Sequence, residues 1–268
     1  ITMYRTYLCS LLLLGLVCGE RIPTALHAAE VFPVAISSLS FGPDSTSQVS
    51  IDELMKLALA GDAEAQFRVA VCYGCGYGVS QDSPKAALWY RRAADKGHVE
   101  AQYNLGVSYE RGVGVPKDYS EAVRWYRRAA DQRYVAAQYN LAGCYYNGRG
   151  VPQDYAEAAR LYRLVADKGY ADAQYNLGLC YANGKGVLRD YDEAFRWYRQ
   201  AANQGNARAQ YRLAVCYDQG VGVAKDPTKA AYWYRRAADQ RSADAKRNSE
   251  VNGYGTPPDY VKASRRYR

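Results

Sequence analysis

The chain has 268 residues, of which 49% are hydrophobic, and its formal net charge is +8. This share of hydrophobic residues supports a packed core, so a wholly disordered chain is excluded. The positive charge permits an acidic partner without naming one. The only histidines are His27 and His98, and their scarcity weighs against catalysis or metal binding that depends on imidazole.

Residues 1–29 have the pattern of a secretory signal. Arg5 precedes an apolar run from Leu8 to Cys18, and small residues follow around Ala28. A short basic segment, an apolar run of about ten residues and small residues suited to a cleavage site are typical of a signal peptide. The run is shorter than the roughly 20 residues that a membrane span needs, and a buried helix is the competing interpretation. We therefore expect a protein that is secreted or placed in the cell envelope or periplasm, with the lumen of the endoplasmic reticulum as the alternative.

Residues 30–50 contain proline, glycine and serine without helical periodicity, which predicts a flexible lead-in. Residues 52–60 follow with Leu54, Leu57 and Ala58 at helical spacing, so we predict a short amphipathic helix that buries these three side chains. Its position in the chain is that of the second half of a repeat, so it is expected to cover the first full unit.

The sequence then repeats every 36 residues without insertion. Such self-similarity is the signature of a solenoid, in which each unit contacts only its neighbours. We predict an all-α solenoid over residues 51–244, consisting of the half-repeat and five full repeats, with residues 245–268 as a degenerate sixth repeat that caps the end. The recurring positions include an alanine before glutamine and a tyrosine, at Ala65, Ala101, Ala137, Ala173 and Ala209 and at Tyr73, Tyr109, Tyr145, Tyr181 and Tyr217.

Each unit reads as two helices. In the second copy, Ala101, Leu105 and Tyr109 form the apolar stripe of the first helix, and a Gly-x-Gly turn ends it because glycine accepts the left-handed conformation.

The second helix begins at an aspartate that is followed three residues later by glutamate, as in Asp118 and Glu121, which predicts a capping box. We expect this helix to bury Ala122, Tyr126 and Ala129, with Trp125 on the flank. Glycine ends three of the second helices, whereas Arg133 and Arg241 stand at that turn in two copies.

The second copy of the repeat combines Ala101-Gln102, Leu105-Gly106, Tyr109, Gly112-x-Gly114-Val115, Asp118, Ala122, Trp125-Tyr126 and Ala129-Ala130. This combination closely resembles the Sel-1-like repeat family, a 36-residue relative of the tetratricopeptide repeat. The likeness extends over about residues 61–268. The resemblance implies antiparallel helix pairs stacked into a right-handed α-solenoid. It also implies a scaffold or adaptor role, often in the cell envelope, in secretory-pathway quality control or in host contact. The matching residues are structural, so the resemblance supplies no active site.

Cysteine recurs at one position of the first helix, with Ser108 in the remaining copy. Neighbouring copies are expected roughly 10 Å apart, beyond the roughly 7 Å between Cα atoms that a disulfide allows, so buried thiols are predicted. Cys72 and Cys75 form a C-x-x-C that lacks the second pair of a zinc site; a local disulfide or redox pair is the alternative. The recurring cysteines are Cys72, Cys144, Cys180 and Cys216.

Two rows of the first helices are candidates for binding, because tyrosine and arginine with amides suit a peptide groove. Packing between repeats is the competing interpretation. The variable pairs that follow, such as Glu110-Arg111, are further candidates for specificity. The two rows are Phe67, Tyr103, Tyr139, Tyr175 and Tyr211, and beside them Arg68, Asn104, Asn140, Asn176 and Arg212.

The second helices present arginines outward, and a basic face of this kind can hold a polyanion. An ordinary solvated face is the competing interpretation, and no nucleic-acid motif is present, so we do not expect nucleic acid as the partner. The arginines are Arg92, Arg124, Arg128, Arg160, Arg196 and Arg236.

No catalytic residue, metal or cofactor is expected. Glycine-rich turns such as Gly184-Lys185-Gly186 lack a following Gly-Lys-Ser/Thr and come after a helix rather than a strand, and no nucleophile elbow is present. The favoured function is a monomeric exported scaffold, without a transmembrane span, that binds a protein or peptide on its concave first-helix face. The alternatives are an envelope enzyme of the β-lactamase-like type that the resemblance implies for cysteine-rich relatives, and a polyanion or glycan binder that uses the convex face.

Overall fold

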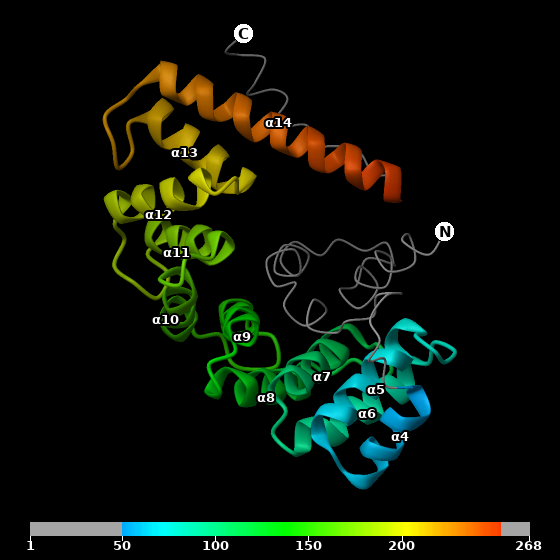
Figure 1. Cartoon of the computed structure of the whole chain (residues 1–268). Helices are drawn as coiled ribbons and strands as arrows, with labels where there is room; N and C mark the ends of the chain where they lie inside the picture. Colours follow the sequence, from blue (N-terminus) through cyan, green and yellow to red (C-terminus); the bar gives the residue numbers. More distant parts are fainter. Residues whose placement is uncertain (1–49, 253–268) are drawn as a thin grey trace. The chain divides into compact units, whose positions relative to one another are not determined.

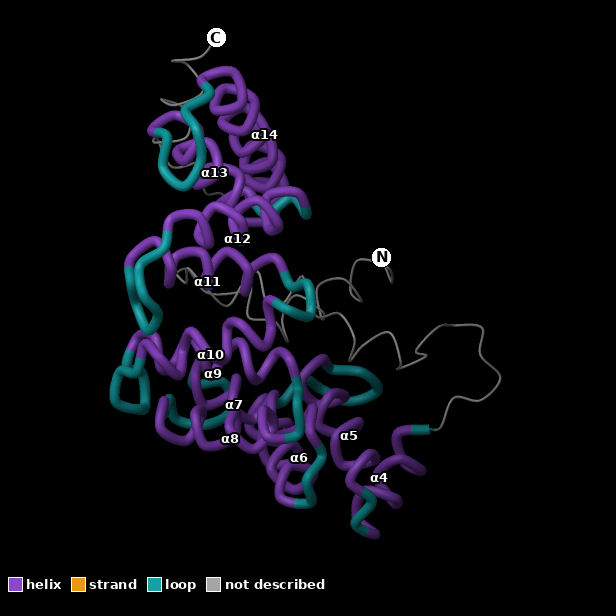
Figure 2. Tube along the Cα trace, turned by 90° about the vertical axis from the view of Figure 1, so that its left-hand side faces the viewer, coloured by secondary structure: helices purple, strands orange, loops and turns teal. Residues whose placement is uncertain are grey.

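The computed structural model describes residues 50–252, and the side chains of residues 50–239. The predicted signal peptide, nearly all of the predicted lead-in and the last sixteen residues of the predicted cap lie outside the described residues. The described part is all-helical and has no strand (Figures 1 and 2). Its helices are α4 (Ile51–Ala60), α5 (Ala63–Cys75), α6 (Ser83–Asp95), α7 (Val99–Arg111), α8 (Tyr119–Asp131), α9 (Val135–Asn147), α10 (Tyr155–Ala166), α11 (Ala171–Asn183), α12 (Tyr191–Asn203), α13 (Ala207–Gln219) and α14 (Pro227–Asn252).

The helices pack in chain order within two compact units, which divide after Gln153. In the first unit each helix from α4 to α9 contacts the next, and in the second unit each helix from α10 to α14 does the same. The predicted repeat array of helix pairs is therefore confirmed. None of the helices in the described range is both long and apolar enough to cross a membrane.

The first helices of the repeats are α5, α7, α9, α11 and α13. In α7, Leu105 has no exposed surface, and Gly112 ends the helix in the left-handed conformation at φ 73°. Burying one leucine side chain of this kind contributes about 1.5–3 kcal/mol, so this leucine, which is replaced by buried Val69 in the first repeat, anchors its helix pair.

The second helices begin at an aspartate cap, but the predicted capping box is only half formed. Asp118 Oδ1 accepts from the backbone N–H groups of Ser120 and Glu121, at 2.8 and 3.1 Å. The Glu121 carboxylate does not return to the cap; it pairs with Arg124 Nη1 at 2.8 Å. An arginine three residues along the same face offers a charged donor, which is a stronger partner than a backbone N–H.

Two burial predictions are corrected. Trp125 is not on the flank of α8, because it has no exposed surface. The Arg91 guanidinium of the preceding repeat lies 5.9 Å from the centroid of the Trp125 ring, a contact that a single-helix pattern does not reveal. In α4, Leu54 and Ala58 are buried as predicted, but Leu57 is 49% exposed; α4 begins the described part of the array and packs on α5.

Glycine is required where one repeat approaches the next most closely. Gly114, in the turn after α7, has φ 74°, and a Cβ there would lie 2.1 Å from the Ser83 carbonyl oxygen at the start of α6. No side chain fits at that distance. The second glycine of the Gly-x-Gly turn is therefore a contact between repeats as well as a turn residue.

The two arginine-substituted turns behave differently. Arg133 keeps the turn by adopting φ 63°, a left-handed conformation that is uncommon for residues with a side chain. At Arg241 the expected turn is absent, because α14 continues to Asn252 (Figure 1). Without glycine at this position, continuing the helix avoids a left-handed residue.

Candidate binding surface on the first helices

One stripe of each first helix faces away from the packed leucine. In α7 it consists of Glu100, Asn104, Val107 and Arg111, which are all partly exposed. Their spacing of four, three and four residues keeps them on one helical face. The equivalent positions of the five first helices are called here the open stripe.

The predicted amide and arginine row lies on this stripe. Arg68, Asn104 and Asn140 are partly exposed and Arg212 is exposed, whereas Asn176 is buried.

The predicted aromatic row lies at its margin, turned toward the second helix. Phe67, Tyr139 and Tyr175 are buried, and Tyr103 and Tyr211 are half-buried. The Tyr103 ring lies 5.9 Å from Tyr126 and 5.3 Å from Tyr134 between ring centroids. These contacts are those of packing within and between repeats, and a binding role for the row stays a prediction.

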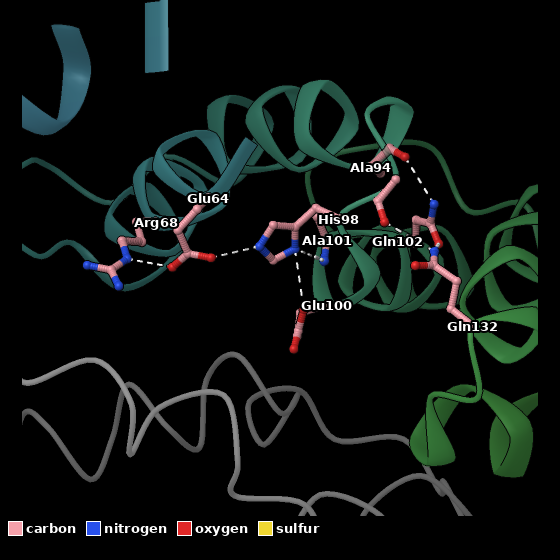
Figure 3. Close-up of polar contacts among 9 residues, drawn as sticks. Glu64, Arg68, Ala94, His98, Glu100, Ala101, Gln102 and Gln132 are labelled. Carbon is pink, nitrogen blue, oxygen red and sulfur yellow. Dashed lines mark hydrogen bonds and ion pairs between the residues drawn. The ribbon is translucent and has the colours of Figure 1, made fainter. Parts of the chain in front are cut away.

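The sequence did not predict a group of polar contacts around His98, at the start of α7 (Figure 3). His98 Nδ1 accepts from the backbone N–H of Ala101 at 3.3 Å, so the side chain caps α7, and the same atom lies 3.4 Å from Glu100 Oε2. Nε2 in turn is 3.0 Å from Glu64 Oε2, and Glu64 also pairs with Arg68 at 2.6 Å. Although burial acts to raise it, the pKa of Glu64 is lowered by hydrogen bonds from His98 and Arg68.

The recurring glutamine has a structural role that its regular spacing did not reveal. Gln102 Nε2 donates to the carbonyl of Ala94 at 3.1 Å. Gln132 Nε2 then donates to Gln102 Oε1 at 2.8 Å and to the carbonyl of Gly97 at 3.1 Å. The glutamine therefore ties each first helix to the end of the preceding second helix. The equivalent bonds run from Gln66 to Ala58, Gln138 to Ala130, Gln174 to Ala166 and Gln210 to Ala202.

The second unit places a buried carboxylate on the open stripe. Asp172 is 4% exposed, and its Oδ1 accepts from Asn206 Nδ2 at 2.8 Å and from Arg208 Nη2 at 2.9 Å. The Arg208 guanidinium also lies over the Tyr175 ring, 4.8 Å from its centroid. Within this cluster the negative charge of Asp172 is paired with the positive charge of Arg208.

In the first unit, the end of α7 carries a group of charged and tyrosine side chains. Tyr126 donates its hydroxyl proton to Glu110 Oε2 at 2.6 Å. Burial raises the pKa of Tyr103 to about 12, although the neighbouring positive charge of Arg111 and a hydrogen bond with Asn140 act to lower it. Arg111 Nη1 is buried and has no hydrogen-bond partner among the described residues.

The arginines on the outer face of the second helices are occupied by contacts within the chain. Arg124, Arg160 and Arg196 pair with the glutamate three residues before them, at 2.7–2.8 Å. The other three predicted arginines lie over tryptophan rings: Arg92 over Trp89, Arg128 over Trp125 and Arg236 over Trp233.

The recurring cysteines are buried thiols. Burial raises the pKa of Cys72, Cys180 and Cys216 to about 11 and that of Cys144 to about 12. Cys75 is half-buried, and no disulfide joins it to Cys72. Among residues 50–239, no three histidine, cysteine, aspartate or glutamate side chains are grouped as a metal site.

The paired helices, the 36-residue period and the open stripe define a helical-repeat scaffold. The model of one family, the Sel1 repeat, matches residues 63–98, 99–134, 135–170, 171–206 and 207–242. The chain belongs to the Sel1 repeat family.

Two solved structures are similar. One is a protective antigen of uropathogenic Escherichia coli with an SLR fold, at 35% identity and a TM-score of 0.70, where the match covers 82% of this chain and 49% of the antigen. The matched region thus spans about half the length of that antigen. The other is a Sel1 repeat protein from Oxalobacter formigenes, at 30% identity and a TM-score of 0.66, covering 81% of this chain and 97% of that protein. A comparison with curated proteins finds no match.

Proposed function

We propose that this chain is a non-enzymatic scaffold that binds another protein or a peptide along the open stripe of its first helices. The observation that carries the proposal is a contrast between positions. The inward glutamine is the same in every repeat and the inward leucine is replaced only by Val69, whereas the positions of the open stripe vary more widely from repeat to repeat. Its last position holds Cys75, Arg111, Asn147, Asn183 and Gln219 in the five first helices.

A constant interior with a varied surface suits selective binding. The constant residues fix the backbone within each unit, so the varied side chains of that unit are held at regular intervals on a rigid frame. Amide and arginine side chains can bond to the backbone and side chains of a bound polypeptide. Export of the scaffold rests on the predicted signal peptide at residues 1–29.

The two rival functions receive less support. A polyanion would have to compete with the glutamates and tryptophans that engage the six outward arginines. For the envelope enzyme of the β-lactamase-like type, the raised pKa values of Cys72, Cys144, Cys180 and Cys216 disfavour a reactive thiolate at these four positions, which leaves half-buried Cys75 as the accessible thiol among the described residues.

Peptide selection from a displayed random library tests the proposal. The stripe variant combines Arg68→Ala, Asn104→Ala and Arg212→Ala, and the matched control combines Arg124→Ala, Arg160→Ala and Arg196→Ala on the outer face. Peptides selected by the wild-type chain should bind the stripe variant at least about tenfold more weakly and the control within about twofold. Equal binding to all three proteins, or no selected peptide, would contradict the proposal. Thermal unfolding of each variant verifies that it is folded.

A further inference from the structure

One leucine of α4 is exposed at a position that the full repeats bury. Gly61 and Gly97 lie 36 residues apart and follow α4 and α6 with positive φ, at 102° and 91°, so α4 has the register of a second helix. In this register Leu57 is 49% exposed, whereas the equivalent side chains have no exposed surface. The equivalent residues are Ala93, Ala129, Val165, Ala201 and Ala237. Since the end units of a solenoid normally present a polar outer face, an apolar side chain at this place indicates that another segment covers it.

The first helix of the same unit covers this face in the full repeats. In the second copy, a Cβ on Gly106 of α7 would lie 2.7 Å from the Tyr126 ring and 3.3 Å from the Ala122 carbonyl oxygen, both in α8. Ala129 follows Ala122 by seven residues, or about two helical turns, and so lies on the same face of α8. The described range begins at residue 50 and holds no first helix in front of α4. Leu57 therefore marks the place where a first helix would lie in a complete unit.

The sequence in front of α4 supplies apolar residues in the matching register. Residues 31–36 read Val-Phe-Pro-Val-Ala-Ile, and residues 67–72 of α5 stand 36 positions later. All of residues 67–72 are buried except Arg68, and each buried position corresponds to an apolar residue of the earlier segment. The shared register also means that as many residues separate this segment from Leu57 as separate residues 67–72 from Ala93. The connection is therefore long enough for the segment to reach α4.

We propose that residues 31–36 of this chain pack on α4 over Leu57, in the place that a first helix takes in the full repeats. Pro33 has no backbone N–H and does not fit the interior of a regular helix, so the proposal concerns this apolar segment and not a complete helix. Removal of apolar surface from water favours the contact. The contact lies at the end of the array and does not depend on the proposed peptide binding.

Two side chains of the segment are expected to face α4. Val31 corresponds to Phe67, whose ring centroid lies 6.0 Å from that of Tyr90 in the second helix of its own unit. Val34 corresponds to Ala70, which is fully buried and lies at the position of the α7 glycine that approaches α8. A charge on either valine would have to be buried against α4, and burying an unpaired charge is costly.

Alkylation of a cysteine introduced at either of two positions of α4 tests the proposal in the full chain. Leu57→Cys reports on the covered face. Leu59→Cys is the matched control, because Leu59 is 67% exposed and two residues along a helix place it on a different face. Iodoacetamide labelling is followed for each cysteine by peptide mass mapping, so the native thiols do not interfere.

The thiol of Leu57→Cys is expected to react at least about tenfold more slowly than that of Leu59→Cys, because the apolar segment keeps the reagent away and disfavours the thiolate. Adding Val31→Asp and Val34→Asp should displace the segment and bring the two rates within about threefold of each other. The matched pair Ser37→Asp and Ser38→Asp adds the same charge just beyond the segment and should leave the tenfold difference in place.

Equal labelling of Leu57→Cys and Leu59→Cys without further substitutions would overturn the proposal, because nothing would then cover this face of α4. A difference that survives Val31→Asp with Val34→Asp would overturn it as well, since something other than this segment would be the cover. If that surviving difference grows with protein concentration, the cover is a second copy of the chain. Thermal unfolding verifies that each variant is folded, and Val31→Ser with Val34→Ser replaces the aspartate pair if that pair unfolds the chain.

Discussion

Burial decides the chemistry of individual side chains in this repeat array. The recurring cysteine is confined against the neighbouring helix, and its thiolate form is disfavoured because water cannot reach it. Two of the aspartate caps, Asp82 and Asp226, are the opposite case. They lie at the surface, where backbone N–H groups and a lysine favour their charged form.

We expect the cysteines to differ sharply in reactivity. A pKa near 11 leaves the thiolate about a hundredfold scarcer at pH 8 than in an ordinary thiol. A short pulse of iodoacetamide followed by peptide mass mapping should therefore modify half-buried Cys75 well before Cys72, Cys144, Cys180 or Cys216. In denaturant all five should react alike. Equal labelling of Cys144 and Cys75 in the folded protein would contradict the burial described for α9.

The caps at Asp82 and Asp226 should make stability depend on pH in the acidic range. Backbone and side-chain hydrogen bonds from Lys85 and Lys229 lower the pKa of these carboxyls from 3.8. A lowered folded-state pKa gives stability that is present above about pH 4 and is lost as the pH falls through the folded-state value.

The expected result is a smaller loss of melting temperature between pH 5 and pH 2 in the double variant Asp82→Asn and Asp226→Asn than in the wild-type chain. Asparagine keeps a capping oxygen but does not titrate. Calorimetry at several pH values measures the difference, and identical pH profiles would show that these caps do not contribute.

At the scale of the elements, the sequence predicts each helix pair well because its signals are local. The alanine–leucine spacing, the aspartate cap and the glycine turn all act within one unit, and each predicted the element that is observed. The mistakes arise where the answer depends on a second element. Trp125 is contacted by Arg91 of the preceding repeat, Glu121 pairs with Arg124 instead of returning to the cap, and α14 continues through Arg241, although Arg133 keeps the equivalent turn in another copy.

The same limit applies to the candidate site. The sequence predicted the amide and arginine row, and its variable pairs included Arg111. It did not separate Glu110, which Tyr126 engages, from Arg111, whose Nη1 has no acceptor. That distinction depends on a tyrosine in the following helix, and no spacing within α7 indicates it.

Close approach between elements gives a prediction with an internal control. Gly114 and Gly97 both have positive φ, at 74° and 91°, but only at Gly114 would a Cβ collide with backbone, whereas nothing lies within 4 Å at Gly97. Both alanine variants carry the conformational cost of roughly 1–2 kcal/mol, and Gly114→Ala should cost about 1–3 kcal/mol more through overpacking. Urea unfolding of the two variants measures this difference. Equal loss of stability would show that the repeats can separate at this turn without cost.

Across the whole molecule, bonds between successive repeats recur within each unit. Arg127 donates to the Tyr145 hydroxyl at 2.9 Å, and Arg91 and Arg163 bond in the same way to Tyr109 and Tyr181. Together with the glutamine bonds, they make each repeat depend on its neighbours. Three arginines, Arg91, Arg127 and Arg163, are therefore engaged in contacts between repeats, and others pair with glutamates within their own helix.

The number of outward arginines that are free to bind a polyanion can be measured through the salt dependence of that binding. A DNA duplex serves as the polyanion. If all six outward arginines were available to it, the affinity for the duplex would fall about a thousandfold or more between 50 and 200 mM salt. If glutamates hold three of the six arginines, the affinity should fall about fortyfold or less over the same range. The triple variant Glu121→Gln, Glu157→Gln and Glu193→Gln releases Arg124, Arg160 and Arg196 and should steepen the dependence toward the larger figure. A wild-type chain that already shows the thousandfold fall would favour a polyanion partner over the peptide scaffold, because the glutamates would then have failed to occupy these arginines.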